Sequence, residues 1–165
     1  MPTISEASIA DFNTIQQIAF KTWPETYGTI LSAAQLNYML ETFYSEETLL
    51  KNLTEKNHHF LIYKESDVAL GFVSFEHHYQ NQPVTRIHKI YILPNNQGLG
   101  IGRTLLNATI DLAKKNHCNR ISLNVNRFNN AQFFYLKNGF EIIKKEDIEI
   151  GNGYLMEDFV MEKQV

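Results

Sequence analysis

Cysteine, long apolar runs and clusters of basic residues are scarce in this sequence. Cys118 is the only cysteine, which excludes an internal disulfide and a metal cluster held by cysteines. A lone cysteine near the end of a predicted helix is expected to be a small packing residue. The apolar runs are strand-sized and fall short of the roughly 20 residues that a membrane-spanning helix requires, so we expect no membrane contact.

The charge and the first residues exclude further classes of protein. A net charge of −3 without a basic stripe or arm argues against nucleic acid as a partner. Residues 1–6 lack the basic segment and apolar core of a secretory signal, so a cytoplasmic location is expected. The 165 residues contain no repeat, low-complexity tract or linker, and they predict one domain over residues 1–165.

The spacing of the apolar residues predicts an α/β fold. Helical spacing comes first, and after Asn57 the pattern becomes that of a hairpin followed by a strand–helix–strand–helix–strand unit. Pro24 is expected to end the first helix, because proline disfavours helical continuation. The predicted helices are residues 11–23, 32–43, 45–53, 103–115 and 131–137, and the predicted strands are residues 3–6, 60–64, 69–76, 84–93, 120–125, a segment after residue 140, and 154–161.

The stretch from Asn95 to Arg103 joins a predicted strand to a predicted helix and holds three glycines in five positions. Without Cβ atoms, the main chain can bring its N–H groups close to a ligand, and the helix start adds unpaired N–H groups and a positive dipole end. These features suit a phosphate or pyrophosphate. The glycine spacing fits neither the P-loop nor the dinucleotide fingerprint. A glycine-rich turn that binds nothing is the alternative.

Two motifs carry a resemblance to a known family. The pattern Gln-x-x-Gly-x-Gly over residues 97–102 resembles the acyl-CoA pyrophosphate loop of the GCN5-related N-acetyltransferases, the GNAT superfamily. The pattern Ala-x-x-x-Tyr-x-x-x-Gly-Phe over residues 131–140 is similar to a second GNAT segment, and it follows the first in the family's order. The resemblance covers about residues 84–140. It implies the GNAT fold, with a mixed central sheet of about seven strands flanked by helices.

The resemblance implies a reaction and a proton donor. GNAT enzymes transfer an acetyl group from acetyl-CoA to an amine by direct attack, so acetyl-CoA is the expected co-substrate and a primary amine of a small molecule the expected acceptor. The tyrosine at the position of Tyr135 is the family's general acid. A phenol with a pKa of about 10 can protonate a departing thiolate of comparable basicity. Packing between helix and sheet is the alternative role of Tyr135.

The resemblance also assigns residues to CoA. Backbone N–H groups of the loop would hold the pyrophosphate, and the preceding strand would offer main-chain groups to the pantetheine arm. The family's asparagine usually lies three residues before the alanine, where this chain has Phe128, so the division between Asn126 and Asn129 stays open. The CoA-binding residues expected are Ile90, Tyr91, Ile92, Gln97, Gly98, Leu99, Gly100, Ile101, Gly102, Arg103, Thr104, Asn126, Asn129 and Phe134.

The general base is less clearly indicated. Family members often carry a glutamate on the strand before the glycine loop, and residues 85–89 have none. His88 is the predicted base, because strand alternation puts it on the face of Ile90 and Ile92 and an imidazole with a pKa of about 6.5 suits proton removal through water. Arg86 is expected on that face too, where it would disfavour a cationic acceptor.

Other residues near the predicted strand ends leave alternatives open. Glu76, His77 and His78 are further candidates for the base, and each histidine could instead be a partly exposed structural residue. The histidines at 77, 78 and 88 also suggest a metal, but no carboxylate spacing supports one, so no metal is expected.

The acceptor is inferred from two acidic and aromatic stretches, residues 35–47 and 153–163. Both resemble GNAT members related to bacterial spermidine/spermine acetyltransferases, and their composition suits a polyamine held by carboxylates and cation–π contacts. Helix solvation explains the charges equally well. The predicted acceptor-binding residues are Trp23, Tyr27, Tyr38, Glu41, Glu76 and Asp158.

Other functions stay open at this point. A protein N-terminus or lysine is the alternative acceptor, and a catalytically silent CoA-binding module is the alternative function. The exposed final hairpin is compatible with a homodimer, which the resemblance to the family suggests.

Overall fold

A seven-stranded sheet forms the centre of the computed structural model, which describes all residues from Met1 to Val165. The strand order is β1-β2-β3-β4-β5-β7-β6, and every neighbouring pair is antiparallel except β4 and β5, which are parallel. The predicted mixed sheet is therefore confirmed. The strands are β1 Pro2–Glu6, β2 His59–Glu65, β3 Val68–Glu76, β4 Val84–Ile92, β5 Arg120–Asn126, β6 Glu141–Gly151 and β7 Tyr154–Gln164.

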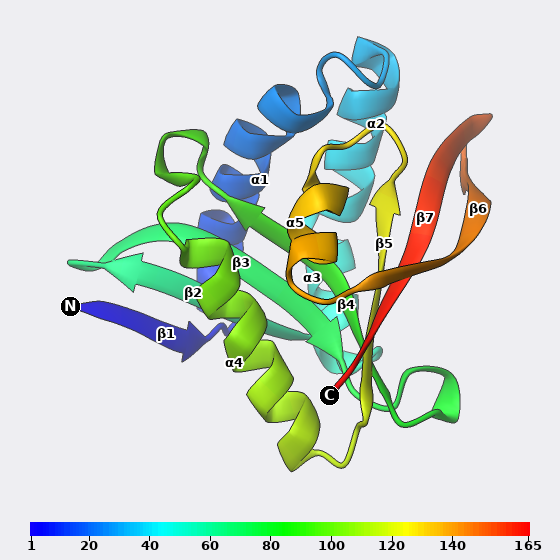
Figure 1. Ribbon diagram of the computed structural model, residues 1–165. Helices are drawn as coiled ribbons and strands as arrows, with labels where there is room; N and C mark the ends of the chain where they lie inside the picture. The colour runs from blue at the N-terminus through cyan, green and yellow to red at the C-terminus, as the bar shows by residue number, and fades with distance from the viewer.

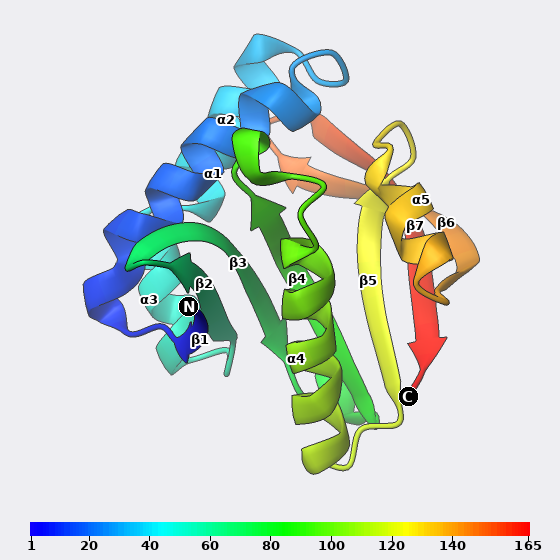
Figure 2. The same cartoon turned by 60° about the vertical axis from the view of Figure 1, so that its left-hand side comes forward.

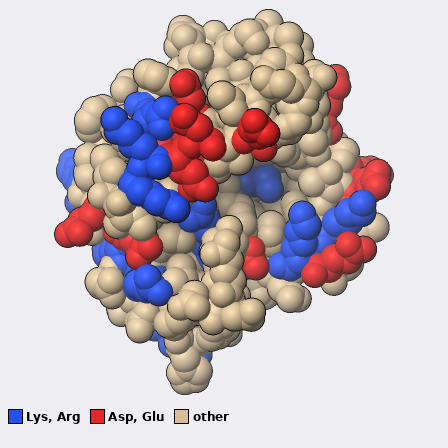
Figure 3. Space-filling model, turned by 90° about the vertical axis from the view of Figure 1, so that its right-hand side faces the viewer, with Lys and Arg blue, Asp and Glu red and all other residues tan.

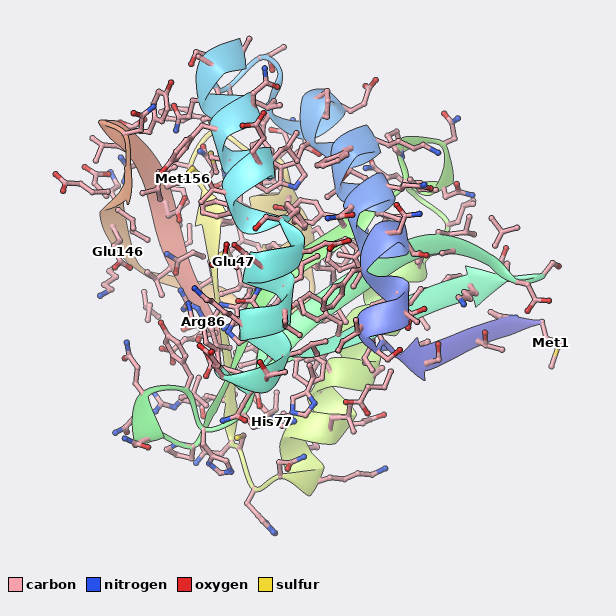
Figure 4. All side chains as sticks on the ribbon, turned by 180° about the vertical axis from the view of Figure 1, so that it is seen from behind. Met1, Glu47, His77, Arg86, Glu146 and Met156 are labelled. Carbon is pink, nitrogen blue, oxygen red and sulfur yellow. The ribbon has the colours of Figure 1, made fainter.

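Helices cover both faces of the sheet (Figure 1). One face carries α1, α2 and α3, which Figure 4 shows from behind, and the other carries α4 and α5. None of the helices is both long and apolar enough to cross a membrane. The helices are α1 Phe12–Tyr27, α2 Ala33–Phe43, α3 Glu46–Thr54, α4 Ile101–Lys115 and α5 Ala131–Lys137, and three short 3-10 helices are η1 Ile9–Asp11, η2 Tyr79–Asn81 and η3 Pro94–Asn96.

Serine caps fix where α2 and α3 begin. The Ser32 hydroxyl accepts a hydrogen bond from the Gln35 N–H at 3.1 Å, and the Ser45 hydroxyl accepts one from the Thr48 N–H at 3.1 Å. Each cap satisfies an N–H group that has no partner inside the helix. Both helix starts agree with the starts that the sequence predicts.

The predicted end of α1 at Trp23 is wrong, because the helix continues through Pro24 to Tyr27. Proline removes one helical hydrogen bond, but the turn beyond it buries Tyr27 against Trp23, with ring centres 4.8 Å apart. The Gly28 N–H donates to the Pro24 carbonyl at 2.9 Å and closes that turn. Aromatic packing thus outweighs the local preference of proline.

Two other boundaries differ from the prediction. Helix α4 begins at Ile101 rather than Arg103, so part of the glycine loop belongs to its first turn. Strand β7 runs to Gln164 rather than Met161, because its last residues pair with the start of β5.

Strands β4 and β5 separate halfway along their length. They pair from Val84 with Arg120 to Ile87 with Leu123, and no further pairs follow. Figure 2 shows the two strands diverging beyond that point. Every other neighbouring pair in the sheet stays together over most of its length. This separation creates the opening in which the candidate site lies.

The core on the α1–α3 face gives a test of the fold. Phe72 is fully buried, and its ring lies 6.0 to 6.4 Å from the rings of Tyr44, Phe60 and Tyr91. Phe72→Ala should lower the free energy of unfolding by about 3–5 kcal/mol, measured by urea denaturation. Phe133→Ala, at a side chain that is 61% exposed, is the matched control and should change it by less than about 0.5 kcal/mol. Equal losses in the two variants would contradict this placement of Phe72.

Candidate active site

A cleft of about 1000 Å³ opens where β4 leaves β5. Its walls come from β4, β5, the first turn of α4, α5 and the connection between α1 and α2. Beyond Ile87, the main-chain groups of β4 that point toward β5 have no strand partner. An extended ligand chain can therefore pair with this stretch as a strand would.

Most residues predicted to bind CoA line this cleft. Three do not: the Leu99 side chain is exposed, the Thr104 hydroxyl donates to the Gly100 carbonyl at 2.9 Å, and Asn126 is buried. The Asn126 side chain accepts the Phe128 N–H at 2.9 Å, so it shapes the loop before α5. The predicted CoA residues that line the cleft are Ile90, Tyr91, Ile92, Gln97, Gly98, Gly100, Ile101, Gly102, Arg103, Asn129 and Phe134.

The glycine loop has the geometry of an anion cradle. Gly98 and Gly100 have φ values of +80° and +83°, a region that favours glycine, and a Cβ at either would meet no atom within 4 Å. Gly100 lies at the N-cap of α4 without a side-chain cap, so the first N–H groups of the helix lack helical partners. These groups and the helix dipole fit the pyrophosphate of CoA.

Tyr135 lies in the wall of the cleft, as its proposed role as proton donor requires. Its ring packs against Phe134 and Phe140, with ring centres 5.3 and 5.6 Å away. Burial raises the pKa of Tyr135 above its ordinary value, and the nearby Tyr27 adds to that shift. The phenol is therefore protonated at neutral pH and can donate its hydrogen.

Two further tyrosines form a polar pair beside Tyr135. The hydroxyls of Tyr27 on α1 and Tyr91 on β4 lie 3.0 Å apart, and both residues line the cleft. Trp23 is buried, with its ring centre 5.7 Å from that of Tyr91, and it does not line the cleft. Of these two predicted acceptor residues, Tyr27 faces the cleft and Trp23 supports it from the core.

Helix α2 is joined to the hairpin formed by β6 and β7. Tyr38 stacks on Tyr154 with ring centres 5.4 Å apart, and its hydroxyl donates to the Ile150 carbonyl at 3.0 Å. The Gln35 amide donates to the Leu155 carbonyl at 2.9 Å. Tyr38 therefore holds α2 to the β6–β7 hairpin and does not line the cleft, whereas Glu41 is exposed on α2.

The predicted face of His88 and Arg86 is wrong. The β3–β4 pairing sets Ser74 against Lys89 and Phe75 against Ile87, so His88 is an extra residue in β4 and the alternation of side chains slips by one. Ile90 and Ile92 pack on the α4 side. His88 and Arg86 lie on the α1–α3 side with Glu76, and no single-strand alternation rule reveals such a bulge.

His88 belongs to a buried hydrogen-bonded cluster. Its Nε2 lies 2.8 Å from the Glu76 carboxylate, which also lies 3.5 Å from Nε2 of His58. The two imidazole rings stack with centres 4.0 Å apart. Burial lowers the pKa of both histidines, that of His58 to about 4, so both are neutral, and Glu76 accepts the N–H group of His88.

These three side chains are also ligand types that zinc prefers, and their ligand atoms lie within 4.8 Å of one another. The positive charge of Lys89 lies close enough to lower the pKa of both histidines, which disfavours a further cation there. The remaining candidates are elsewhere: His77 pairs with the Thr85 hydroxyl at 2.7 Å, and His78 lies 4.0 Å from the sulfur of Cys118.

Arg86 and Asp158 form a polar group that sequence reasoning did not connect. Arg86 donates to Ser122 at 3.2 Å and to the Asn124 side chain, and Asn124 donates to Oδ2 of Asp158 at 3.2 Å. Figure 4 shows Arg86 between α3 and the β6–β7 hairpin. Figure 3 shows a hollow in the face that carries this hairpin, with a basic side chain at its bottom and acidic side chains near its rim.

Asn124 was missed, although the sequence contains a signal for it. Ser122, Asn124 and Asn126 alternate along an otherwise apolar strand, which places three polar residues on one face of β5. A row of polar side chains inside a sheet usually marks hydrogen-bonding or binding groups.

Comparisons with known proteins agree with this geometry. A sequence model described as the Acetyltransferase (GNAT) family matches residues 12–140. The chain belongs to the GNAT family. It is an N-acetyltransferase, and acetyl-CoA is its co-substrate. The match spans α1 to α5, beyond the region that carries the two motifs.

Individual relatives cover nearly the whole chain. The spermidine N(1)-acetyltransferase of Thermoplasma acidophilum is 30% identical, over 98% of this chain and 96% of its own length. The crystal structure of a PaiA N-acetyltransferase from T. acidophilum in complex with coenzyme A has a TM-score of 0.84 at 28% identity, covering 100% and 99% of the two chains. A GCN5-related N-acetyltransferase from Rhodopseudomonas palustris, with a TM-score of 0.85 at 21% identity over 100% and 96%, shares the fold.

The cradle gives a prediction about CoA binding. Gly100→Ala puts a Cβ on a residue with φ +83°, so the free loop should relax to another conformation. CoA binding must then restore φ +83° at a cost of about 1–2 kcal/mol, and affinity for CoA should fall roughly tenfold. Gly102→Ala is the matched control: its Cβ would make an ordinary contact 3.5 Å from Phe134, and affinity should fall less. Isothermal titration with CoA measures both, and the reverse order would argue against the cradle.

The buried histidines give a prediction about stability and pH. Because His58 has a pKa of about 4 when folded and about 6.5 when unfolded, the unfolded chain binds a proton first as the pH falls. The stability that neutral His58 contributes is thus complete above pH 6.5 and is lost between there and pH 4. His58→Asn should lose less melting temperature between pH 7 and pH 5 than the wild type does, by calorimetry. His117→Asn, at an exposed histidine, should behave like the wild type.

Proposed function

We propose that this N-acetyltransferase acetylates a primary amine of a polyamine. The proposal is supported by the 30% identity to a relative named as a spermidine N(1)-acetyltransferase, which extends over 98% of the chain. The carrying observation in the site is Asp158, a carboxylate that is 5% exposed and has one oxygen, Oδ1, without a hydrogen-bond donor. An ammonium group supplies both the charge and the donor that this oxygen lacks.

The residues around the cleft can bind acetyl-CoA and supply the proton that acetyl transfer requires. When bound, acetyl-CoA supplies an activated acetyl thioester, with its pyrophosphate on the N–H groups at the start of α4 and its pantetheine arm along β4. The acceptor amine attacks the carbonyl carbon, and the carbon–sulfur bond breaks. The Tyr135 hydroxyl donates its proton to the departing thiolate.

The walls around the site favour a small acceptor over a protein. Helix α2, which follows the cleft-lining connection after α1, is held to the β6–β7 hairpin by hydrogen bonds from Gln35 and Tyr38, so an extended polypeptide has no passage between these two elements. A slender, flexible amine needs less room.

Thiol release from acetyl-CoA tests this function on a panel of spermidine, spermine, amino acids and N-terminal peptides. We expect turnover with the polyamines. Tyr135→Phe should lower kcat roughly 10²- to 10⁴-fold, because the proton donor is lost, with the affinity for CoA unchanged. Phe133→Ala on the same helix is the control for disturbance of α5.

The other outcomes have distinct meanings. Turnover only with N-terminal peptides would replace the polyamine by a protein acceptor. Tight CoA binding without turnover of any amine would support the binding-module alternative. Full activity of Tyr135→Phe would remove Tyr135 from the reaction.

A further inference from the structure

The position of Asp158 on β7 brings it level with the open part of the cleft, one layer behind the residues that line it. Asp158 pairs with Asn126, which follows Leu123, the last β5 residue paired with β4, by three positions. Asp158 therefore lies level with the part of β5 that has left β4. His88 lines the cleft, but it follows Ile87, the last paired residue of β4, directly and so lies nearer the closed end.

The contacts of Asp158 put it on the acceptor side of the sheet. Its Oδ2 accepts from Asn124, a cleft-lining residue that also accepts from Arg86 on the α1–α3 side. Its charge acts on Tyr27, whose hydroxyl pairs with Tyr91. The carboxylate therefore stands directly behind side chains that line the cleft.

The free oxygen of Asp158 distinguishes it from the other carboxylates near the site. Oδ1 is buried and has no donor in the protein, whereas the Glu76 carboxylate accepts from His88 at 2.8 Å and has His58 at 3.5 Å. A buried carboxylate oxygen without a donor is costly and is usually retained for a reason. A donor that arrives with the acceptor, the N–H of its amine or of a bridging water, removes that cost.

The charges that face Asp158 come from three elements. Arg86 on β4 and Arg127 after β5 favour the ionised carboxylate, while Glu146 on β6 opposes them. Burial is the largest effect and raises the pKa of Asp158 above its usual range. A carboxylate that binds a proton more tightly than an exposed one is the stronger base, which suits proton removal.

His88 is less suited to that role. Its Nε2 is engaged with Glu76, and its ring is held between His58 at 4.0 Å and Tyr79 at 5.9 Å. Burial and nearby positive charges lower its pKa, which makes the imidazole a weak base. Its assignment as base from the sequence stays a prediction that the experiment below addresses.

We propose that Asp158 is the general base that removes the proton from the acceptor ammonium. This inference rests on the proposed acetyl transfer to an amine. The ammonium gives one proton to the Asp158 carboxylate, directly or through one water, and the freed lone pair attacks the thioester carbonyl. The carbon–nitrogen bond forms, the carbon–sulfur bond breaks and the thiolate takes the proton of Tyr135. The second proton of the amine nitrogen restores Tyr135, and Asp158 releases its proton to solvent.

The test is the pH dependence of kcat/KM for Asp158→Asn, with whichever amine of the panel the wild type acetylates. At pH 7 the variant should be roughly 10²- to 10⁴-fold slower. The difference in rate between the variant and the wild type should shrink about tenfold for each unit by which the pH rises toward the pKa of the amine, because the fraction of free amine in solution grows by the same factor. Glu157→Gln, the neighbouring exposed carboxylate, is the matched control and should follow the wild type.

Three other results of this experiment would overturn the assignment of Asp158 as the base. Asp158→Asn that raises KM without altering the pH profile makes Asp158 an ammonium anchor and overturns the base assignment. The same pH-dependent recovery in His88→Gln, and not in Asp158→Asn, gives the role to His88. A wild type that binds CoA yet acetylates no amine overturns the proposed transfer itself, so the two failures are distinguishable.

Folding of the variant is checked separately. Because the pKa of Asp158 is raised on folding, the folded protein loses stability as the pH rises from the unfolded pKa through the folded one. Asp158→Asn removes this cost and should melt at the same or a higher temperature at pH 7, with the CoA affinity of the wild type.

Discussion

The separation of β4 from β5 is the constraint on which the site depends. A parallel pair that continued to the ends of both strands would bury its main-chain groups in mutual hydrogen bonds. Here pairing stops at Ile87 and Leu123, and the remaining residues of β4 keep an open edge. The glycine loop follows β4 directly and leads into α4. The unpaired edge of β4 therefore lies beside the start of α4. A linear ligand with a pyrophosphate at one end fits that combination.

The two faces of the sheet offer different kinds of chemical group to this opening. On the side of α4 and α5, binding relies on main-chain N–H groups, with glycines keeping the approach clear, and it tolerates much variation in the neighbouring side chains. On the side of α1, α2 and α3 lie titratable side chains from three strands: Arg86, Asp158 and the Glu76 cluster. Members of a family can therefore share the co-substrate while differing in acceptor.

This division explains how much the sequence predicts. The placement of the glycine loop and Tyr135 at the cleft was predictable because it depends on short-range spacing within one turn or one helix. The face of His88 was not, because a bulge in β4 depends on its partner strand and shifts the alternation. The helix through Pro24 was missed because distant aromatic contacts outweigh a local preference. Asp158 was predicted as an acceptor contact, but its link to Asn124 and Arg86 joins residues far apart in the chain.

The single cysteine, which the sequence suggested was a packing residue, is buried at 3% exposure in the core on the α4 side. The folded chain thus presents no reactive thiol of its own to solvent. Any thiol that a colorimetric reagent detects while the protein stays folded comes from released CoA. A sudden extra equivalent of thiol would instead signal that the core around Cys118 has opened, so one reagent separates catalysis from unfolding.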